Sequence, residues 1–502
     1  MILRTPETES ADRLDRLSDL LSPIVIKEVR QMVRGREFNY SFTLSVVAGL
    51  LVALYTGMYA TTGTEDYGVG IFAALMACLT VVGVVIAPMG AFNALRNERM
   101  ERTLDLVTVT TLSPRRIVIG KLMAQAVKLA TLFAALAPFV AMSFLLGGID
   151  FLTIVLSLAA VFLWSLWACA AALFLSCLSR SRAISGLIFG GMIILLLFVI
   201  GTGGMGFFLV RTVTYGPGYG GPPISSAFVT GGTDLWWGLA GMTLVCVVSM
   251  VNLILLAENR LLLPTEDRST ALRIGFFVQF LLIIGVAVFQ VSSRPTYLAS
   301  LFANMLGVLG GLQLAGVALF SVTEELVLSR RIHLQNKNAS GWRRYLAIFR
   351  PGGARGAAYI LAQMALFLAV GAVVLPISGW EFSWLVAICG YICFFTGVPA
   401  CAGRILSPRP LKPVHLRVGA LLLFPVATLL PDFLVYLVTG DFGGIYSLRH
   451  VLDPIRTLSA WSNPTTTPWH FLSLGLGVIG VASYLILIRM GRRASSANET
   501  AH

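Results

Sequence analysis

The segment from Glu98 to Lys121 reads Glu98-Arg99-Met100-Glu101-Arg102-Thr103-Leu104-Asp105-Leu106-Val107-Thr108-Val109-Thr110-Thr111-Leu112-Ser113-Pro114-Arg115-Arg116-Ile117-Val118-Ile119-Gly120-Lys121. It is a dense block of charge in a chain in which only 12% of the residues are charged. One apolar span, centred near Val81, precedes this block, and another, centred near Phe133, follows it. Because charge is costly away from water, the block must meet water or another protein, and it is a candidate docking surface.

The composition of the chain indicates a membrane protein. Its 502 residues are 57% hydrophobic, with a mean hydropathy of +0.83. A soluble protein has about a quarter of its residues charged, roughly twice the share found here. Apolar runs of about 20 residues, long enough to cross roughly 30 Å of hydrocarbon, recur from Ser41 to Arg489. Strands of a β-barrel would be shorter and would alternate polar with apolar residues, so the sequence predicts an all-α, polytopic helical membrane protein.

The apolar runs predict about twelve transmembrane helices. Their centres lie near Val47, Val81, Phe133, Phe162, Ile193, Val245, Leu282, Val308, Phe367, Cys393, Thr428 and Ile479. We expect an N-terminus with an amphipathic interfacial helix in 1–40, a six-helix transmembrane domain in 41–260, a second six-helix membrane region in 261–490 and a tail in 491–502.

The basic residues predict the orientation of the chain. With the N-terminus in the cytoplasm, all but four of the 37 lysines and arginines fall on the cytoplasmic side, including the group from Arg96 to Lys128. The four exceptions are Arg211, Arg294, Arg449 and Arg456. By the positive-inside rule, this bias places both termini in the cytoplasm and the chain in an inner membrane. Contact with anionic membrane lipid explains the net charge of +13 without any nucleic-acid partner.

The segment before the first span has the pattern of an interfacial helix. It reads Ser22-Pro23-Ile24-Val25-Ile26-Lys27-Glu28-Val29-Arg30-Gln31-Met32-Val33-Arg34. Ser22 can cap a helix whose first turn accepts Pro23. Apolar residues share one side of that helix, and basic residues share the other: Val25, Val29, Met32 and Val33 against Lys27, Arg30 and Arg34. Such a helix either lies in the interface with its basic face toward lipid phosphates or is a plain juxtamembrane anchor.

The charged loop, taken as 93–121, has helix signals of its own. Residues Arg96 to Thr108 lack glycine and proline and can extend the second span into the cytoplasm. Glu98 and Arg102 are four residues apart, in the favourable order for a helical ion pair. Ser113-Pro114 then restarts a helix. The loop is therefore either a protruding helix hairpin that docks a cytosolic partner or a solvated connection.

These motifs together resemble the ABC-2 type transporter permeases. Ser22 to Arg30 looks like the amphipathic N-terminal helix of that family. Glu98-Arg99-x-x-x-Thr103-Leu104, Thr111-Leu-Ser-Pro114 and Gly120-Lys121 look like its cytoplasmic loop, and the following span breaks at Pro138 and ends at Gly147-Gly148 in the same way. The resemblance covers roughly 20–260. One departure is Arg102, where the family usually has glycine.

The resemblance implies a permease that pairs with a second transmembrane domain and with two cytoplasmic ABC ATPase subunits. We expect it to be an exporter. The ATPase contact would carry over to Glu98, Arg99, Thr103 and Leu104, together with Lys27, Glu28 and Arg30 of the interfacial helix. The chain has no phosphate-binding loop of its own, because Gly120-Lys121-Leu122 lacks the Ser/Thr, and position 115 is arginine instead of the upstream glycine. We therefore expect no enzyme activity and no cofactor in this chain, with ATP bound on the partner.

The second half either duplicates the first or is an accessory region. A displacement of 238 residues aligns Ala124-Gln125 with Ala362-Gln363 and Pro138 with Pro376. Thr323-Glu324-Glu325-Leu326 follows the eighth span as the charged block follows the second. If the halves are repeats, one chain supplies both transmembrane domains. If they are not, the chain pairs with a second copy or with a second permease.

Other functions remain open at this stage. Ionisable residues inside the spans are scarce, with Asp432 and Glu258 the clearest, which argues against an ion-coupled secondary transporter. A membrane-embedded enzyme could use the outer loop that holds Asp441, His450, Asp453 and His470, although no spacing there fixes a metal site. The seven cysteines lie in or beside apolar runs and predict packing rather than disulfides. A non-transporting scaffold with the permease fold is the third alternative.

Overall fold

The computed structural model describes thirteen ranges of the chain. They are 23–59, 67–100, 114–145, 151–178, 185–194, 232–262, 266–292, 296–326, 347–378, 382–406, 411–439, 450–459 and 467–500. Within these ranges the regular secondary structure is helical throughout. Ten of the described helices are long and apolar enough to cross a membrane. The chain is thus a multi-pass helical membrane protein, as predicted at this coarse level.

Two shorter apolar helices accompany the ten. They are Ser185–Ile194 and Leu306–Val322, and they fall where the fifth and eighth spans were expected. The count of twelve transmembrane helices stays a prediction.

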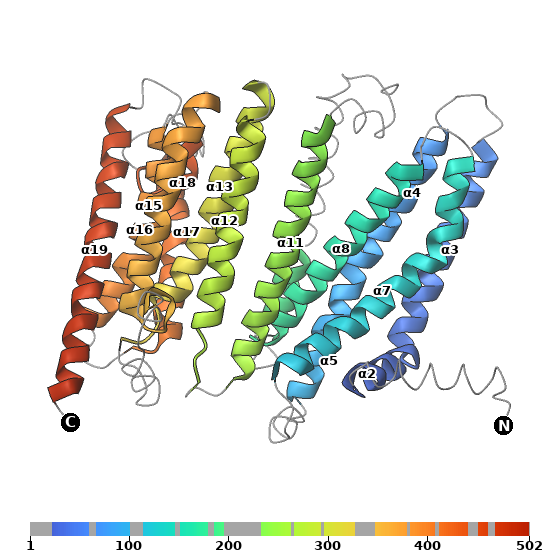
Figure 1. Cartoon of the computed structure of the whole chain (residues 1–502), viewed down its shortest axis with the longest axis horizontal. Helices are drawn as coiled ribbons and strands as arrows, with labels where there is room; N and C mark the ends of the chain where they lie inside the picture. The colour runs from blue at the N-terminus through green and yellow to red at the C-terminus, as the bar shows by residue number, and fades with distance from the viewer. Residues whose placement is uncertain are drawn as a thin grey trace, which may run out of the picture. The chain divides into compact units, whose positions relative to one another are not determined.

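The chain divides into two units (Figure 1). Unit 1, Met1–Leu262, contains α2 (Pro23–Val33), α3 (Arg36–Tyr59), α4 (Tyr67–Val81), η2 (Val82–Ile86), α5 (Ala87–Met100), α7 (Pro114–Leu145), α8 (Phe151–Ser176) and α11 (Gly232–Leu261). Unit 2, Leu263–His502, contains α12 (Thr270–Ser292), α13 (Thr296–Val322), α15 (Gly353–Ser378), α16 (Phe382–Ile405), α17 (Pro413–Thr439), α18 (Pro454–Ser459) and α19 (Thr467–Thr500). Whether unit 2 repeats unit 1 stays a prediction.

In unit 1, one long span is built from α4, η2 and α5. The π-helical turn η2 lies directly before Pro88, whose ring and missing N–H disturb an ordinary α-helical turn. After this turn, Phe92 and Leu95 of α5 are buried against Leu129 of α7 and Leu173 of α8. The span continues as helix to Met100, so Glu98 lies in the last turn of α5.

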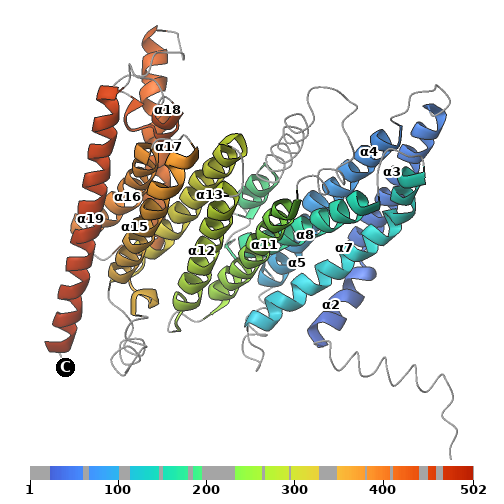
Figure 2. The same cartoon turned by 45° about the horizontal axis from the view of Figure 1, so that its top comes forward.

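The amphipathic helix α2 lies against one end of α3 and α7 (Figures 1 and 2). Gly35 follows α2 and separates it from α3, which begins at Arg36. Val25 of α2 is only 7% exposed, whereas Val33 is 47% exposed. Part of the apolar face that was expected to enter the acyl layer is therefore covered by the protein itself.

In unit 2, α16 and α19 approach each other backbone to backbone. A Cβ atom added to Gly477 of α19 would lie 2.9 Å from the Cα of Gly390 on α16. Such small-residue contacts let membrane helices pack closely. About two turns further along each helix, the hydroxyls of Thr396 and Tyr484 lie 2.6 Å apart in the buried interface. Unit 2 therefore has a tightly packed core of its own.

Candidate functional site

A buried lysine and two glutamates join three helices of unit 1. Lys121 of α7 has a side chain that is only 3% exposed. Its Nζ donates hydrogen bonds to Oε1 of Glu98 at 2.8 Å and to Oε1 of Glu28 at 3.0 Å. Glu98 belongs to the last turn of α5, and Glu28 belongs to α2. We call these three residues the Lys121 cluster.

Local sequence explains why the three side chains meet. Pro114 begins α7, a position where its missing N–H costs nothing. Lys121 then lies two turns along the helix, on the stripe that also carries Val118, Gln125 and Lys128. All four of these residues are buried, so the stripe faces the interior of unit 1. The ammonium group of Lys121 is thereby held where the middle of α2 meets the last turn of α5.

The buried ammonium of Lys121 depends on the carboxylates of Glu28 and Glu98 for its stability. A buried ammonium needs a carboxylate, since an unpaired buried charge costs several kcal/mol, on the order of 3–5 when one partner is removed. Here the two carboxylates are 15% and 32% exposed, and water can therefore reach them in part. The cluster couples α2 to α5 and α7, the two helices that flank residues 101–113.

The structure brings together two of the seven residues expected at the ATPase contact. Glu98 and Glu28 both bind Lys121. Lys27 and Arg30 are exposed on a different side of α2 from Glu28. Arg99 lies in α5, but its side chain is not among those described, and Thr103 and Leu104 lie outside the described residues.

Sequence reasoning missed the role of Lys121 and the burial of its neighbour on α7. Lys121 and Lys128 were counted with the basic residues of a cytoplasmic loop, but α7 begins at Pro114, and both lysines are 3% exposed. The apolar residues that surround each lysine at helical spacing were the available signal. Ionisable residues inside the helices are therefore more numerous than the sequence suggested.

Unit 2 has a second buried ion pair, between Arg273 of α12 and Glu324 beyond the end of α13. The Nη2 atom of Arg273 lies 2.7 Å from Oε2 of Glu324. Glu324 also accepts hydrogen bonds from Oγ of Ser269 at 2.6 Å and from the backbone N–H of Gly352 at 2.9 Å. Arg273 in turn donates to the backbone oxygen of Arg350 at 2.6 Å. We call Ser269, Arg273, Glu324 and Gly352 the Glu324 cluster.

A third polar group in unit 2 surrounds Asp432 of α17. Its two carboxylate oxygens each lie 3.0 Å from a partner, one from Nε2 of His450 and the other from Nη2 of Arg456. His450 is 1% exposed. Asp453 instead caps α18 by accepting the backbone N–H of Ile455 at 2.9 Å.

These contacts occupy two of the four outer-loop residues that were considered as metal ligands. His450 and Asp453 have the partners just described, Asp441 lies outside the described residues, and the side chain of His470 is not described. In the part of the chain that the structure covers, no group of three or more His, Cys, Asp and Glu side chains could hold a metal ion.

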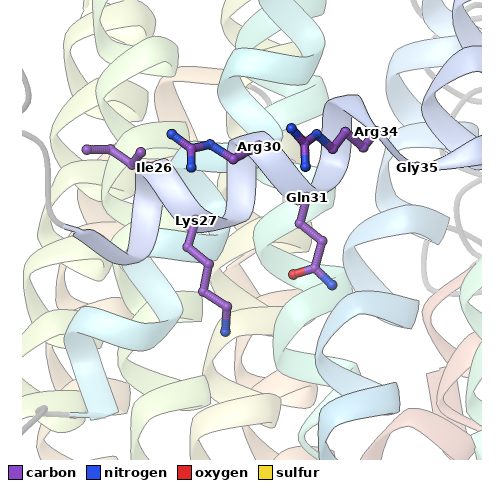
Figure 3. Close-up of a pocket in the computed structure, with 6 residues that line it drawn as sticks. All are labelled: Ile26, Lys27, Arg30, Gln31, Arg34 and Gly35. Atoms are coloured by element: carbon purple, nitrogen blue, oxygen red, sulfur yellow. The ribbon is translucent and has the colours of Figure 1, made fainter.

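A basic hollow lies along α2, away from the Lys121 cluster. It has a volume of about 580 Å³ and is lined by Ile26, Lys27, Arg30, Gln31, Arg34 and Gly35. Figure 3 shows Lys27 and Gln31 extending side by side, with the guanidinium groups of Arg30 and Arg34 one turn apart. The helix thus carries cations on this surface and a carboxylate in its contact with α7.

Compared with protein-family models, with curated proteins and with solved structures, the chain matches none of them.

Proposed function

We propose that this chain is the membrane permease subunit of an ATP-driven transporter of the ABC-2 type, working as an exporter with a separate ATPase subunit. The proposal rests on the sequence resemblance of 20–260 and on one structural observation. That observation is the Lys121 cluster, which ties the interfacial helix α2 to the two helices that flank the charged segment 101–113.

The position of the Lys121 cluster suits it to transmit a movement of a cytoplasmic partner to the helices of unit 1. A partner that grips the 93–121 segment would move the end of α5 and the start of α7 together. Because Glu28 is bonded to Lys121, α2 would follow that motion. Nucleotide binding and hydrolysis on the partner would supply the energy, and the residues of this chain would convert it into helix movement.

The proposal includes the setting of the chain. The basic side of the spans would face the cytoplasm of a bacterial cell, with twelve spans and both termini on the inner side. If unit 2 is a worn copy of unit 1, one chain supplies both transmembrane domains. If it is not, the chain pairs with a second copy or with another permease.

Charge reversal at the loop tests the proposal. The double variant E98K/R99E is expected to lose transport-coupled ATP hydrolysis in membranes that contain the chain and its ATPase. Because the lysine introduced at position 98 would face the buried Lys121, the comparison is made at equal amounts of folded chain, measured by size exclusion. The matched control R492E/E499K makes the same exchange of charges in α19 and should retain coupling. Normal coupling in E98K/R99E, or the failure of any ATPase to co-purify with the wild-type chain, would contradict the assignment and favour a non-transporting scaffold.

A secondary transporter is the second candidate, and one observation favours it. Asp432 of α17 pairs with buried His450 and with Arg456, and such carboxylate–histidine pairs carry protons in many pumps and transporters. A chain of this kind would move substrate in proteoliposomes under a proton gradient with no ATPase present. D432N would abolish that uptake, whereas an ATP-driven permease would show no gradient-driven transport to lose.

A further inference from the structure

The basic hollow on α2 is a regular stripe of cations. Lys27, Arg30, Gln31 and Arg34 each lie three or four residues from two of the others, which places them on neighbouring turns of one side of the helix. All four side chains are exposed (Figure 3). The stripe extends over about 10 Å of helix, from the rise of about 1.5 Å per residue. Its length is that of one or two phosphate groups side by side.

The stripe has no acidic partner on its own helix. Glu28 is the one acidic residue of α2, and it is bonded to Lys121. Among the described residues, no carboxylate forms an ion pair with Lys27, Arg30 or Arg34. Like charges three and four residues apart destabilise a helix slightly. An anion in the hollow would remove that repulsion.

The position of α2 along the chain indicates at which level of the membrane the hollow lies. Gly35 lines the hollow, and the apolar span of α3 begins three residues later, at Phe38. The other helix packed against α2 is α7, itself a candidate span from Pro114 to Leu145. The hollow therefore lies where these helices leave the hydrocarbon, at the level of the lipid headgroups.

We infer that this hollow binds the phosphate of an anionic phospholipid headgroup. The guanidinium groups of Arg30 and Arg34 suit the two-pronged recognition of phosphate, and Lys27 adds a point charge. The amide of Gln31 can donate to a headgroup hydroxyl or ester oxygen. The bond from Lys121 to Glu28, which lies on the flank of the stripe, fixes the rotation of α2 about its axis. The inference does not depend on the proposed ATPase partner.

An exposed apolar side chain beside the stripe favours a lipid as the occupant over an acidic protein surface. Val33, on the same helix, is 47% exposed, and an apolar side chain beside a cationic stripe matches an acyl chain beside its phosphate. Soluble anions share the phosphate chemistry but cannot use this apolar contact. A lipid held here would anchor α2 against movements of α7.

The test measures lipid affinity directly on the purified full-length chain. Native mass spectrometry gives the affinity of the first phosphatidylglycerol and, separately, of the first phosphatidylcholine. At about fivefold for each of the three basic residues near an anionic headgroup, phosphatidylglycerol should bind the wild type about a hundredfold more tightly. R30Q/R34Q should lose about 25-fold of that preference. The matched control R489Q/R492Q removes two exposed arginines from α19 and should keep it.

One further arm separates the sources of phosphate. Inorganic phosphate at millimolar concentration should leave the bound lipid in place, and displacement by it would show a site for free anions instead. Equal affinity of the wild type for the two lipids, or an equal loss in R30Q/R34Q and R489Q/R492Q, would overturn the inference. Unaltered elution of each variant in size exclusion ensures that a loss reports on the site.

Discussion

The Lys121 cluster of unit 1 and the Glu324 cluster of unit 2 hold helix ends together in different ways. Lys121 donates to two carboxylates, each at the end of a flexible side chain and partly exposed. Glu324 accepts from Arg273, from the hydroxyl of Ser269 and from the backbone of Gly352. Arg273 also donates to backbone oxygens, among them that of Gly352 at 3.2 Å. One cluster joins side chains, and the other joins side chains to backbone.

The contacts of unit 1 therefore suit helix movement better than those of unit 2. Side-chain bonds can be exchanged for water by rotating a glutamate, and the helices need only slide. Backbone bonds are fixed to the helix ends, and Gly352 holds them with a φ of 123°, a conformation that favours glycine. The bonds that join α2 to α5 and α7 can therefore break and re-form during a coupled movement, whereas α12, α13 and α15 are fastened at one end.

The largest effect is expected in unit 2. R273M removes the counter-charge of Glu324, which keeps only its neutral donors Ser269 and Gly352, and it removes the side-chain donor to the backbone oxygen of Arg350. The loss of stability should therefore be about 3–5 kcal/mol. Thermal unfolding in nanodiscs, with hydrogen exchange localised to α12 and α15, measures it. The control R417M should cost less, about 1 kcal/mol, because Thr323 keeps its bond to the backbone oxygen of Leu319. Similar losses in the two variants would contradict a special role for the Glu324 cluster.

A smaller effect is expected from removing both carboxylates of the Lys121 cluster. E28Q/E98Q leaves the ammonium of Lys121 buried without a counter-charge, although the glutamine oxygens can still accept its hydrogen bonds. We expect a loss of about 2 kcal/mol, with faster hydrogen exchange in α2 and the start of α7. The control E325Q alters an exposed glutamate and should change stability by less than about 0.5 kcal/mol. If α2 exchanges no faster in E28Q/E98Q than in the wild type, the cluster is not what holds it.

The comparison also marks how far the sequence could be interpreted. The apolar runs predicted a polytopic helical protein because membrane helices must satisfy their own backbone, so their length and composition are visible in the chain. Glu98 was noted as part of the charged block, Glu28 through the family resemblance, and Lys121 as part of the Gly120-Lys121 motif. That the two glutamates pair with Lys121 was not predicted, since a contact between residues 93 positions apart depends on how α2 folds back onto α7.

Buried basic residues were the main obstacle to the sequence-based interpretation. Lys121, Lys128 and Arg273 were assigned to cytoplasmic segments between the spans, yet all three lie within helices and each is at most 3% exposed. Asp432 was recognised as an ionisable residue inside a span, but its partner His450, which comes from beyond α17, was not. Burial of this kind is a tertiary property, because the helix packing and not the local sequence decides which side of a helix is covered.

The smallest loss of stability is expected from K121M, and this variant allows the most direct comparison of the Lys121 cluster with the Glu324 cluster. Methionine fills the space of the lysine stem with an apolar chain, and Glu28 and Glu98 are left facing each other. Because both carboxylates are partly exposed, they can hydrate, and the loss should be about 1 kcal/mol. R273M is the matched change in unit 2, and its several-fold larger cost would show that backbone partners make the difference. Equal losses of stability for K121M and R273M, measured in the same nanodiscs, would mean that the two clusters are equally rigid and that unit 1 is no better suited to move.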